Sequence, residues 1–227
     1  MISRRKLLYF SAILSVCYPV ANFKCFAIAG VKLNDKPYPL TLSLLKEAYW
    51  AETIANRHYY EYCQKALSEN YPNIAYLFLA LAVSEEIHAQ NFKRLIVSLG
   101  SKTNDKEIKI SIENTKKNLN TASIKELEKI NEFYPIIVKK MASESHDQAV
   151  INCMYSWKSH EQHEKIITNI KRYSRLFFKP LASKIEGMNP NYYVCEICGS
   201  TVDEPPGIPC EICNYPVYHY NKLDRPS

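Results

Sequence analysis

The chain has 227 residues and a net charge of +6, and four of the positive charges lie in the first 30 residues, which leaves +2 for the rest. No basic stripe interleaved with aromatic residues follows, so the composition argues against nucleic acid as a partner. The length allows one sizeable core and a small extra module. Only 5 glycines are present, which favours long helices over a turn-rich β fold.

Residues 1–29 have the pattern of an export signal. The string Ser3-Arg4-Arg5-Lys6-Leu7-Leu8 precedes an apolar stretch, and small residues allow cleavage after Ala29. The string resembles a twin-arginine signal; the alternatives are an ordinary secretory signal, an uncleaved N-terminal anchor, or a lipoprotein signal ending at Cys17. Export after folding would protect thiols that hold a metal. We therefore expect an exported, periplasmic protein that meets a membrane only through this segment.

A first helix is predicted over residues 40–69, because alanine, leucine and tyrosine recur there with the helical period. Thr41 or Ser43 can cap it. Glu52 lies among alanines and tyrosines on the inner side, and Tyr59 follows seven residues later, nearly in line. A carboxylate in that setting is not simply a solvated charge.

A second helix is predicted over residues 74–99, ending at Gly100. Within Ser84-Glu85-Glu86-Ile87-His88, the spacing places Glu85 and His88 on one helix face. Such a pair can hold one metal ion, although a buried pair bonded only to itself is the alternative. The polar residues 101–114 then form a long crossover to the next helix.

A third helix is predicted over residues 115–145, tightened or kinked at Pro135. Glu126 and Tyr134 lie on roughly the same side. Ser123 and Glu126 also fit a capping box. Thr115 is the better start, because the helical period already holds for the residues that follow it.

A fourth helix is predicted over residues 147–173, where Cys153, His160 and His163 recur on one face. A single histidine there would more often belong to the core, but two in this register favour a metal. Four helices that each direct a donor inward form a di-metal carboxylate site. The sequence therefore predicts an all-α fold, with a four-helix bundle over residues 30–173.

The C-terminal part predicts a second metal site. A linker over residues 174–191 leads to a small domain over residues 192–227, where Cys195-x-x-Cys198 and Cys210-x-x-Cys213 are separated by eleven residues. Two such knuckles place four thiolates around one iron or zinc ion. Gly199 and Asn214 follow the knuckles and tolerate a left-handed backbone.

The two remaining cysteines beyond the leader are Cys63 and Cys153. If the first and fourth helices run parallel, these side chains would be roughly 30 Å apart, too far for a disulfide. We expect two buried thiols.

Over about residues 40–225 the chain resembles the rubrerythrin family. The resemblance is carried by Glu52 with Tyr59, Glu85-x-x-His88, Thr115-x-x-Asn118-Leu119 leading to Glu126 and Tyr134-Pro135, then His163, and the paired CxxC after Tyr193-Val194. It implies a ferritin-like bundle followed by a rubredoxin-like domain. It also implies a di-iron peroxidase that reduces hydrogen peroxide to water in oxidative stress protection. Electrons would come from an unidentified donor through an iron in the Cys₄ site, with zinc as the alternative metal, and the protein would be a homodimer.

The resemblance also implies the site residues. Tyr59 and Tyr134 would hydrogen-bond ligand carboxylates or bound peroxide. The bundle metals would be held by three carboxylates and three imidazoles, and the tail metal by four thiolates: Glu52, Glu85, His88, Glu126, His160, His163, Cys195, Cys198, Cys210 and Cys213.

Two positions depart from the family pattern. Lys129 stands where a second glutamate of the third helix is expected, and His160 stands where the fourth helix should have a glutamate. Two ferric ions need several anionic ligands, so we expect a partly occupied di-iron centre, with weaker binding beside His160 and His163 than beside Glu85-x-x-His88. An inward Lys129 would neutralise Glu126 and compete with a metal there, whereas a Lys129 that extends outward to solvent would leave the site open. The alternatives are a non-catalytic metal-binding or electron-transfer protein, and an iron-oxidising or iron-storing bundle.

Overall fold

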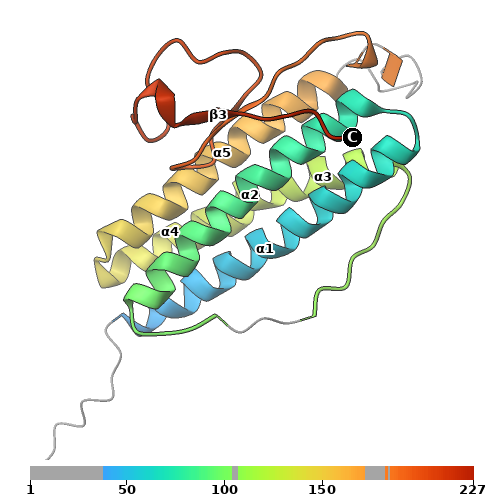
Figure 1. Ribbon diagram of the computed structural model, residues 1–227. Coiled ribbons are helices and arrows are strands. Elements are labelled where there is room, and N and C mark those ends of the chain that lie inside the picture. Colours follow the sequence, from blue (N-terminus) through green and yellow to red (C-terminus); the bar gives the residue numbers. More distant parts are fainter. Residues whose placement is uncertain (1–37, 104–106, 172–181, 184) are drawn as a thin grey trace, which may run out of the picture. The chain divides into compact units, whose positions relative to one another are not determined.

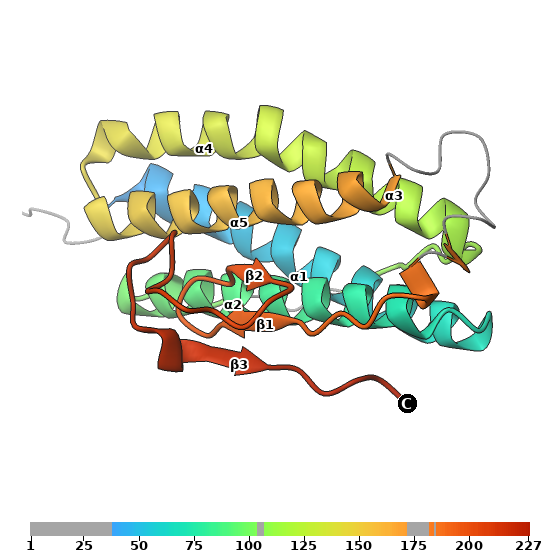
Figure 2. The same ribbon diagram turned by 90° about the horizontal axis from the view of Figure 1, so that it is seen from above.

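The computed structural model describes residues 38–103, 107–171, 182–183 and 185–227. The predicted export signal lies outside the described residues. Figures 1 and 2 show long helices side by side, with a small three-stranded sheet lying along α2 and α5.

The helices are α1 (Pro39–Ser68), α2 (Pro72–Ser98), α3 (Thr115–Glu128), the π-helical turn η1 (Lys129–Phe133), α4 (Tyr134–Met141), the short η2 (Ala142–Glu144) and α5 (Asp147–Lys171). The predicted all-α class with a small C-terminal module is confirmed.

Each of the first two helices begins with a proline and is capped by a distant carboxylate. At α1, the backbone N–H groups of Leu40 and Thr41 donate to Glu144, at 3.1 and 2.7 Å. The expectation that Thr41 or Ser43 caps α1 is therefore wrong, because Glu144 accepts from these N–H groups. Glu144 lies at the end of the third helical segment, which consists of α3, η1, α4 and η2. A carboxylate at a helix N-terminus also interacts favourably with the helix dipole.

The third helical segment begins where the sequence predicted. The side chain of Asn114 accepts from the N–H of Lys117 at 3.0 Å, so α3 starts at Thr115. Glu126 is a buried residue in its last turn and not a capping residue. The irregularity expected at Pro135 takes the form of the π turn η1, directly before α4. Pro135 lacks the N–H that a regular α-helix needs.

The bundle interior has a polar layer between two apolar clusters. One cluster includes Tyr62, Cys63 and Phe78, and the other includes Phe92, Met141 and Cys153. Cys63 and Cys153 are buried free thiols in different clusters, as predicted. Burial raises the pKa of Cys63 to about 11 and that of Cys153 to about 12, so both thiols stay protonated and inert.

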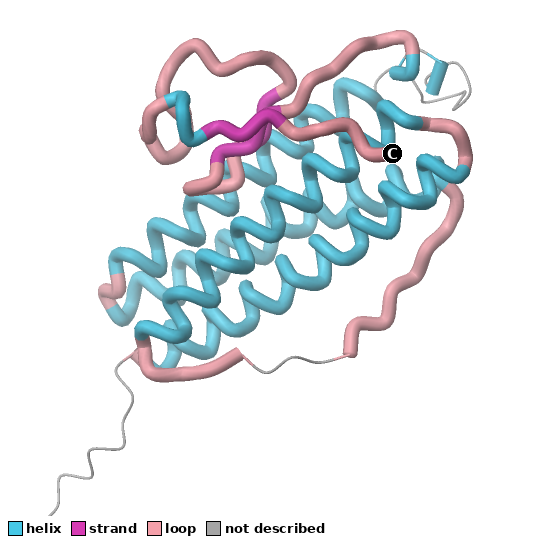
Figure 3. The backbone as a smooth tube through the Cα atoms, in the orientation of Figure 1, coloured by secondary structure: helices cyan, strands magenta, loops and turns pink. Residues whose placement is uncertain are grey.

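The C-terminal module is an antiparallel sheet of β1 (Tyr193–Cys195), β2 (Thr201–Val202) and β3 (Tyr220–Lys222), with β1 in the centre (strands magenta in Figure 3). Tyr193 pairs with Val202 on one side and with Lys222 on the other. The short 3₁₀ turn η3 (Val217–His219) precedes β3. Gly199 and Asn214 have φ of 79° and 59°, so the predicted left-handed backbone after each knuckle is confirmed.

The described end of the predicted linker, residues 182–183 and 185–191, packs against the bundle. Ile185 is buried in the core, and the carboxylate of Glu186 accepts from the N–H groups of Asn73 and Ile74 at the start of α2. This end of the linker therefore anchors the chain to the bundle before β1 begins. Of the helices in the described ranges, none is both long and apolar enough to cross a bilayer.

Candidate metal centres

The polar layer of the bundle brings together all six donors that the sequence indicated. Glu52 comes from α1, Glu85 and His88 from α2, Glu126 from α3, and His160 and His163 from α5. Each has an exposed fraction of 0%. Two overlapping groups have donor atoms within 4.8 Å of one another: Glu52, Glu85, His88 and His160 form the first, and Glu85, Glu126, His160 and His163 form the second.

His88 lies between a carboxylate and a backbone carbonyl of the C-terminal module. Its Nδ1 is 2.9 Å from Glu85 Oε2, and its Nε2 is 3.0 Å from the carbonyl oxygen of Cys198. Burial lowers the pKa of His88, which favours the neutral ring with a single N–H. If Nε2–H donates to the carbonyl of Cys198, the lone pair of Nδ1 faces the carboxylate of Glu85. The lone pair and the carboxylate repel each other, and a cation bound by both would remove this repulsion. Carbonyl-oriented imidazoles of this kind are typical of metal ligands.

His163 and Glu85 each provide a buried atom that could bind a metal ion. His163 Nδ1 and Glu85 Oε1 are buried side-chain atoms without a hydrogen-bond partner, and they are 3.6 Å apart. His163 Nδ1 is also 3.4 Å from Glu126 Oε2, while Nε2 is 3.3 Å from the hydroxyl of Thr201. An unsatisfied buried polar atom costs about 1–3 kcal/mol. A metal ion would satisfy both atoms, so the second donor group fits a cation.

His160 bridges the two groups. Its Nδ1 is 2.7 Å from Glu126 and its Nε2 is 3.2 Å from Glu52. Burial by itself lowers the pKa of His160, but Glu85 and the other two carboxylates outweigh it and raise the pKa to about 10. In the absence of metal, His160 is therefore an imidazolium that donates to two carboxylates, and it must lose a proton before it can bind a metal.

Lys129 points into the first donor group. Its ammonium donates to Glu52 and lies 3.6 Å from Glu85 Oε1, and its side chain is 12% exposed. Although burial lowers the pKa of Lys129, the neighbouring carboxylates raise it overall, so the ammonium stays charged. The expectation that an inward Lys129 would neutralise Glu126 is wrong, because Glu52 is its partner. The first group thus contains a resident cation.

The two tyrosines contact carboxylates, one of the two roles expected. Tyr59 donates to Glu126, and Tyr134 donates to Glu52. Burial and the nearby carboxylates raise the pKa of each phenol well above its usual value, so both remain protonated donors. They hold two of the three carboxylates in fixed orientations.

The four cysteines of the tail bring their sulfur atoms together in a compact cluster. Cys195 and Cys213 have sulfurs 3.7 Å apart, and those of Cys198 and Cys210 are 3.5 Å apart. A tetrahedral metal with metal–sulfur bonds of about 2.3 Å has sulfur–sulfur edges of roughly 3.8 Å. The cluster therefore fits one tetrahedral ion, as the paired knuckles predicted.

The sequence did not reveal the contacts that join the tail to the bundle. Ser84 and Ser159 donate to the carbonyl of Gly199 at 2.6 and 2.9 Å. The carbonyl of Cys198 also contacts His88, and the hydroxyl of Thr201 contacts His163. These contacts together fix the tail against α2 and α5. Each serine directly precedes a donor residue, but hydroxyls are too common on helices for that to be a signal.

Comparison with known proteins agrees with this arrangement. The rubrerythrin family model matches residues 43–171. Rubrerythrin-2 of Clostridium acetobutylicum is 28% identical over 176 residues, which cover 77% of this chain and 91% of that protein.

Solved structures show the same fold. Fully reduced, all-ferrous nigerythrin superposes with a TM-score of 0.69 at 22% identity, over 81% of this chain and 86% of the other. The bacterioferritin of Mycobacterium tuberculosis superposes with a TM-score of 0.60 at 16% identity, over 65% and 94%. The bundle is therefore ferritin-like and its tail fits a rubredoxin-like domain. With a family match over more than half of its length, the chain belongs to the rubrerythrin family.

Proposed function

We propose that this chain is an oxidoreductase that reduces hydrogen peroxide at the bundle centre, with electrons entering through the Cys₄ site. The observation that carries the proposal is the position of His88, whose ring joins Glu85 to the carbonyl of Cys198. One imidazole thus connects the two candidate metal sites within the chain. Family membership supports iron as the metal, and iron supplies one-electron redox chemistry that zinc lacks.

The residues of the bundle would have distinct roles. The three carboxylates and three histidines of the polar layer hold the metals. Tyr59 and Tyr134 fix the carboxylates of Glu126 and Glu52 by hydrogen bonds. Since the donors are fully buried, the two apolar clusters around them keep bulk water out and strengthen every charge interaction.

A second function is favoured by Lys129. Its contact with Glu52 places a positive charge where a metal would need a free carboxylate. With the bundle centre compromised in this way, the chain would be a non-catalytic metal-binding or electron-transfer protein. Measuring peroxide turnover separates the two functions.

Protein reduced anaerobically with dithionite and then mixed with hydrogen peroxide is expected to recover the visible absorbance of its Cys₄ iron within seconds, with two electrons consumed per peroxide. A variant with Cys195→Ser, which removes one thiolate of that site, should consume peroxide much more slowly when reductant is supplied. If the reduced protein stays bleached after peroxide is added, the peroxidase proposal is wrong.

The Cys₄ site should contain iron. Protein as isolated is then expected to be red, because ferric thiolate sites absorb visible light, and dithionite should bleach it. Metal analysis should give one iron per chain in this site. Colourless protein with one zinc per chain would contradict the electron relay and favour the second function.

Export remains a prediction from residues outside the described part of the chain. Replacing Arg4 and Arg5 by lysine should leave folded, metal-loaded protein in the cytoplasm if the signal is of the twin-arginine type. Cell fractionation of the two forms measures this. Unchanged export would indicate the ordinary secretory route.

The homodimer is likewise a proposal, for which size-exclusion chromatography with light scattering is the test.

A further inference from the structure

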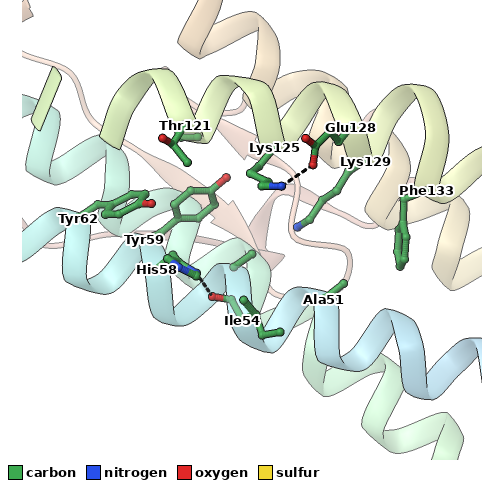
Figure 4. Close-up of a pocket in the computed structure, with 12 residues that line it drawn as sticks. Ala51, Ile54, His58, Tyr59, Tyr62, Thr121, Lys125, Glu128, Lys129 and Phe133 are labelled. Atoms are coloured by element: carbon green, nitrogen blue, oxygen red, sulfur yellow. Dashed lines mark hydrogen bonds and ion pairs between the residues drawn. The ribbon is translucent and has the colours of Figure 1, made fainter. Parts of the chain in front are cut away.

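A cavity of about 320 Å³ lies between α1 and the segment formed by α3 and η1, beside the polar layer (Figure 4). Its walls are mainly small, aliphatic or aromatic side chains, including Ala51, Ile54, Ala55, Tyr62 and Phe133. On the rim, Lys125 and Glu128 neutralise each other at 2.6 Å. The outer part of the cavity therefore suits an uncharged, apolar group.

Two side chains belong both to this cavity and to the polar layer. Tyr59 and Lys129 line the cavity, and they donate to Glu126 and Glu52 respectively. Figure 4 shows Tyr59 extending from α1 and Lys129 extending toward it from the opposite helix. A ligand in the cavity would therefore meet apolar walls along most of its length. At its inner end, next to the carboxylates, it would meet the Lys129 ammonium, which has further protons to donate, and the Tyr59 hydroxyl oxygen, which can accept because its proton goes to Glu126.

The volume exceeds what hydrogen peroxide needs. A water molecule occupies roughly 30 Å³ in the liquid, so a molecule with two oxygens fills only a small part of the cavity. Small-molecule sites are typically about 300–1,000 Å³ and mostly apolar with a few convergent polar groups. The cavity has the size and the lining of such a site.

We propose that the cavity binds the organic part of a hydroperoxide, ROOH, with its hydroperoxyl end beside Tyr59 and Lys129. The inference rests on the proposed peroxide-reducing function and names a larger class of substrate for the same centre. The O–O bond breaks and takes up two electrons, which an external reductant delivers one at a time through the Cys₄ site, together with two protons taken up from the buffered solvent. An alcohol, ROH, and a water molecule leave.

Binding can be tested without turnover. The alcohol 2-phenyl-2-propanol, which is the product of cumene hydroperoxide, should bind saturably to the full-length metal-loaded protein in calorimetric or NMR titrations. Ala55→Phe, which fills the cavity, should weaken that binding at least tenfold, and Ala51→Phe provides a second filling variant. Gln64→Phe, an exposed position of the same helix outside the cavity, should bind as the natural protein does.

Measuring turnover provides an independent test of the same inference. The natural protein should reduce both cumene hydroperoxide and hydrogen peroxide, and Ala55→Phe should lower the ratio of the first rate to the second at least tenfold. Reduction of hydrogen peroxide without reduction of cumene hydroperoxide overturns the inference and leaves the proposed function intact. Reduction of neither overturns both. Absence of saturable alcohol binding, or equal binding by the filled variants, also overturns the inference.

Discussion

Replacing Lys129 and His160 together by glutamate is expected to raise both the iron content of the bundle and the rate of peroxide reduction. The change removes an ammonium that contacts Glu52 and a ring that the carboxylates hold as an imidazolium. In their place it adds two anionic donors. Two unit charges about 4 Å apart interact by roughly 4 kcal/mol at an effective dielectric constant near 20, so an increase in affinity of at least about tenfold is expected.

The position of Lys129 also predicts which of the two bundle sites is weaker in the natural protein. Lys129 lies in the group of Glu52, Glu85, His88 and His160. His163, whose buried Nδ1 has no hydrogen-bond partner, belongs only to the group of Glu85, Glu126, His160 and His163. Iron titrated into metal-free protein should therefore fill the second group first. This order is the reverse of the one that the sequence pattern suggested, because that pattern did not show where Lys129 points.

Iron titration followed by absorbance, and peroxide turnover under excess reductant, measure the effect of the double substitution. Lys117→Glu is the matched control for the lysine: it makes the same charge change as Lys129→Glu about three helical turns earlier, on an exposed side chain that pairs with Glu113. It should alter neither iron content nor rate. Natural protein that already binds two irons tightly and reduces peroxide as fast as the double variant would show that His160 is a competent ligand and that the charge argument is wrong.

The long elements and the donors on them were predictable from the sequence. Each helix carries the apolar period over many turns, and Glu85 with His88 shares one face at a spacing that local geometry alone determines. Paired CxxC knuckles likewise specify their own local backbone, so the left-handed Gly199 and Asn214 were predictable. These features depend on residues near one another in the chain.

The features that were missed depend on tertiary contacts. Glu144 caps α1 across 103 residues of chain, and no local pattern indicates that. Lys129 has a long flexible side chain whose head could have reached solvent or the interior. The carbonyl of Cys198 is a backbone group, so the residue type says nothing about its contact with His88. The contact between the two candidate metal sites is therefore visible only in the folded chain.

That contact predicts a large effect for Gly199→Ala. Gly199 has φ of 79°, which an alanine adopts only with strain, and a Cβ added there would collide with Nε2 of His88 and lie 2.8 Å from Cδ2 of the same ring and 2.9 Å from the Ser84 hydroxyl. Real Cβ atoms do not approach neighbours this closely. Since α2, which carries both residues, cannot yield without opening the core, the knuckle must move away from His88. If electrons pass from the Cys₄ site to the bundle, as proposed above, their transfer should then slow markedly.

The other knuckle supplies the matched control for this change. Asn214 occupies the equivalent position, with φ of 59°, and its N–H donates to Cys210 at 2.8 Å, just as that of Gly199 donates to Cys195 at 2.8 Å. Asn214→Ala therefore imposes the backbone strain, roughly 1–2 kcal/mol, at an exposed position away from His88. In single-turnover reoxidation by peroxide, Gly199→Ala should be slow and Asn214→Ala close to the natural protein, while both retain the visible spectrum of a loaded Cys₄ site. Equal rates for the two variants would mean that electrons do not need the contact between Cys198 and His88.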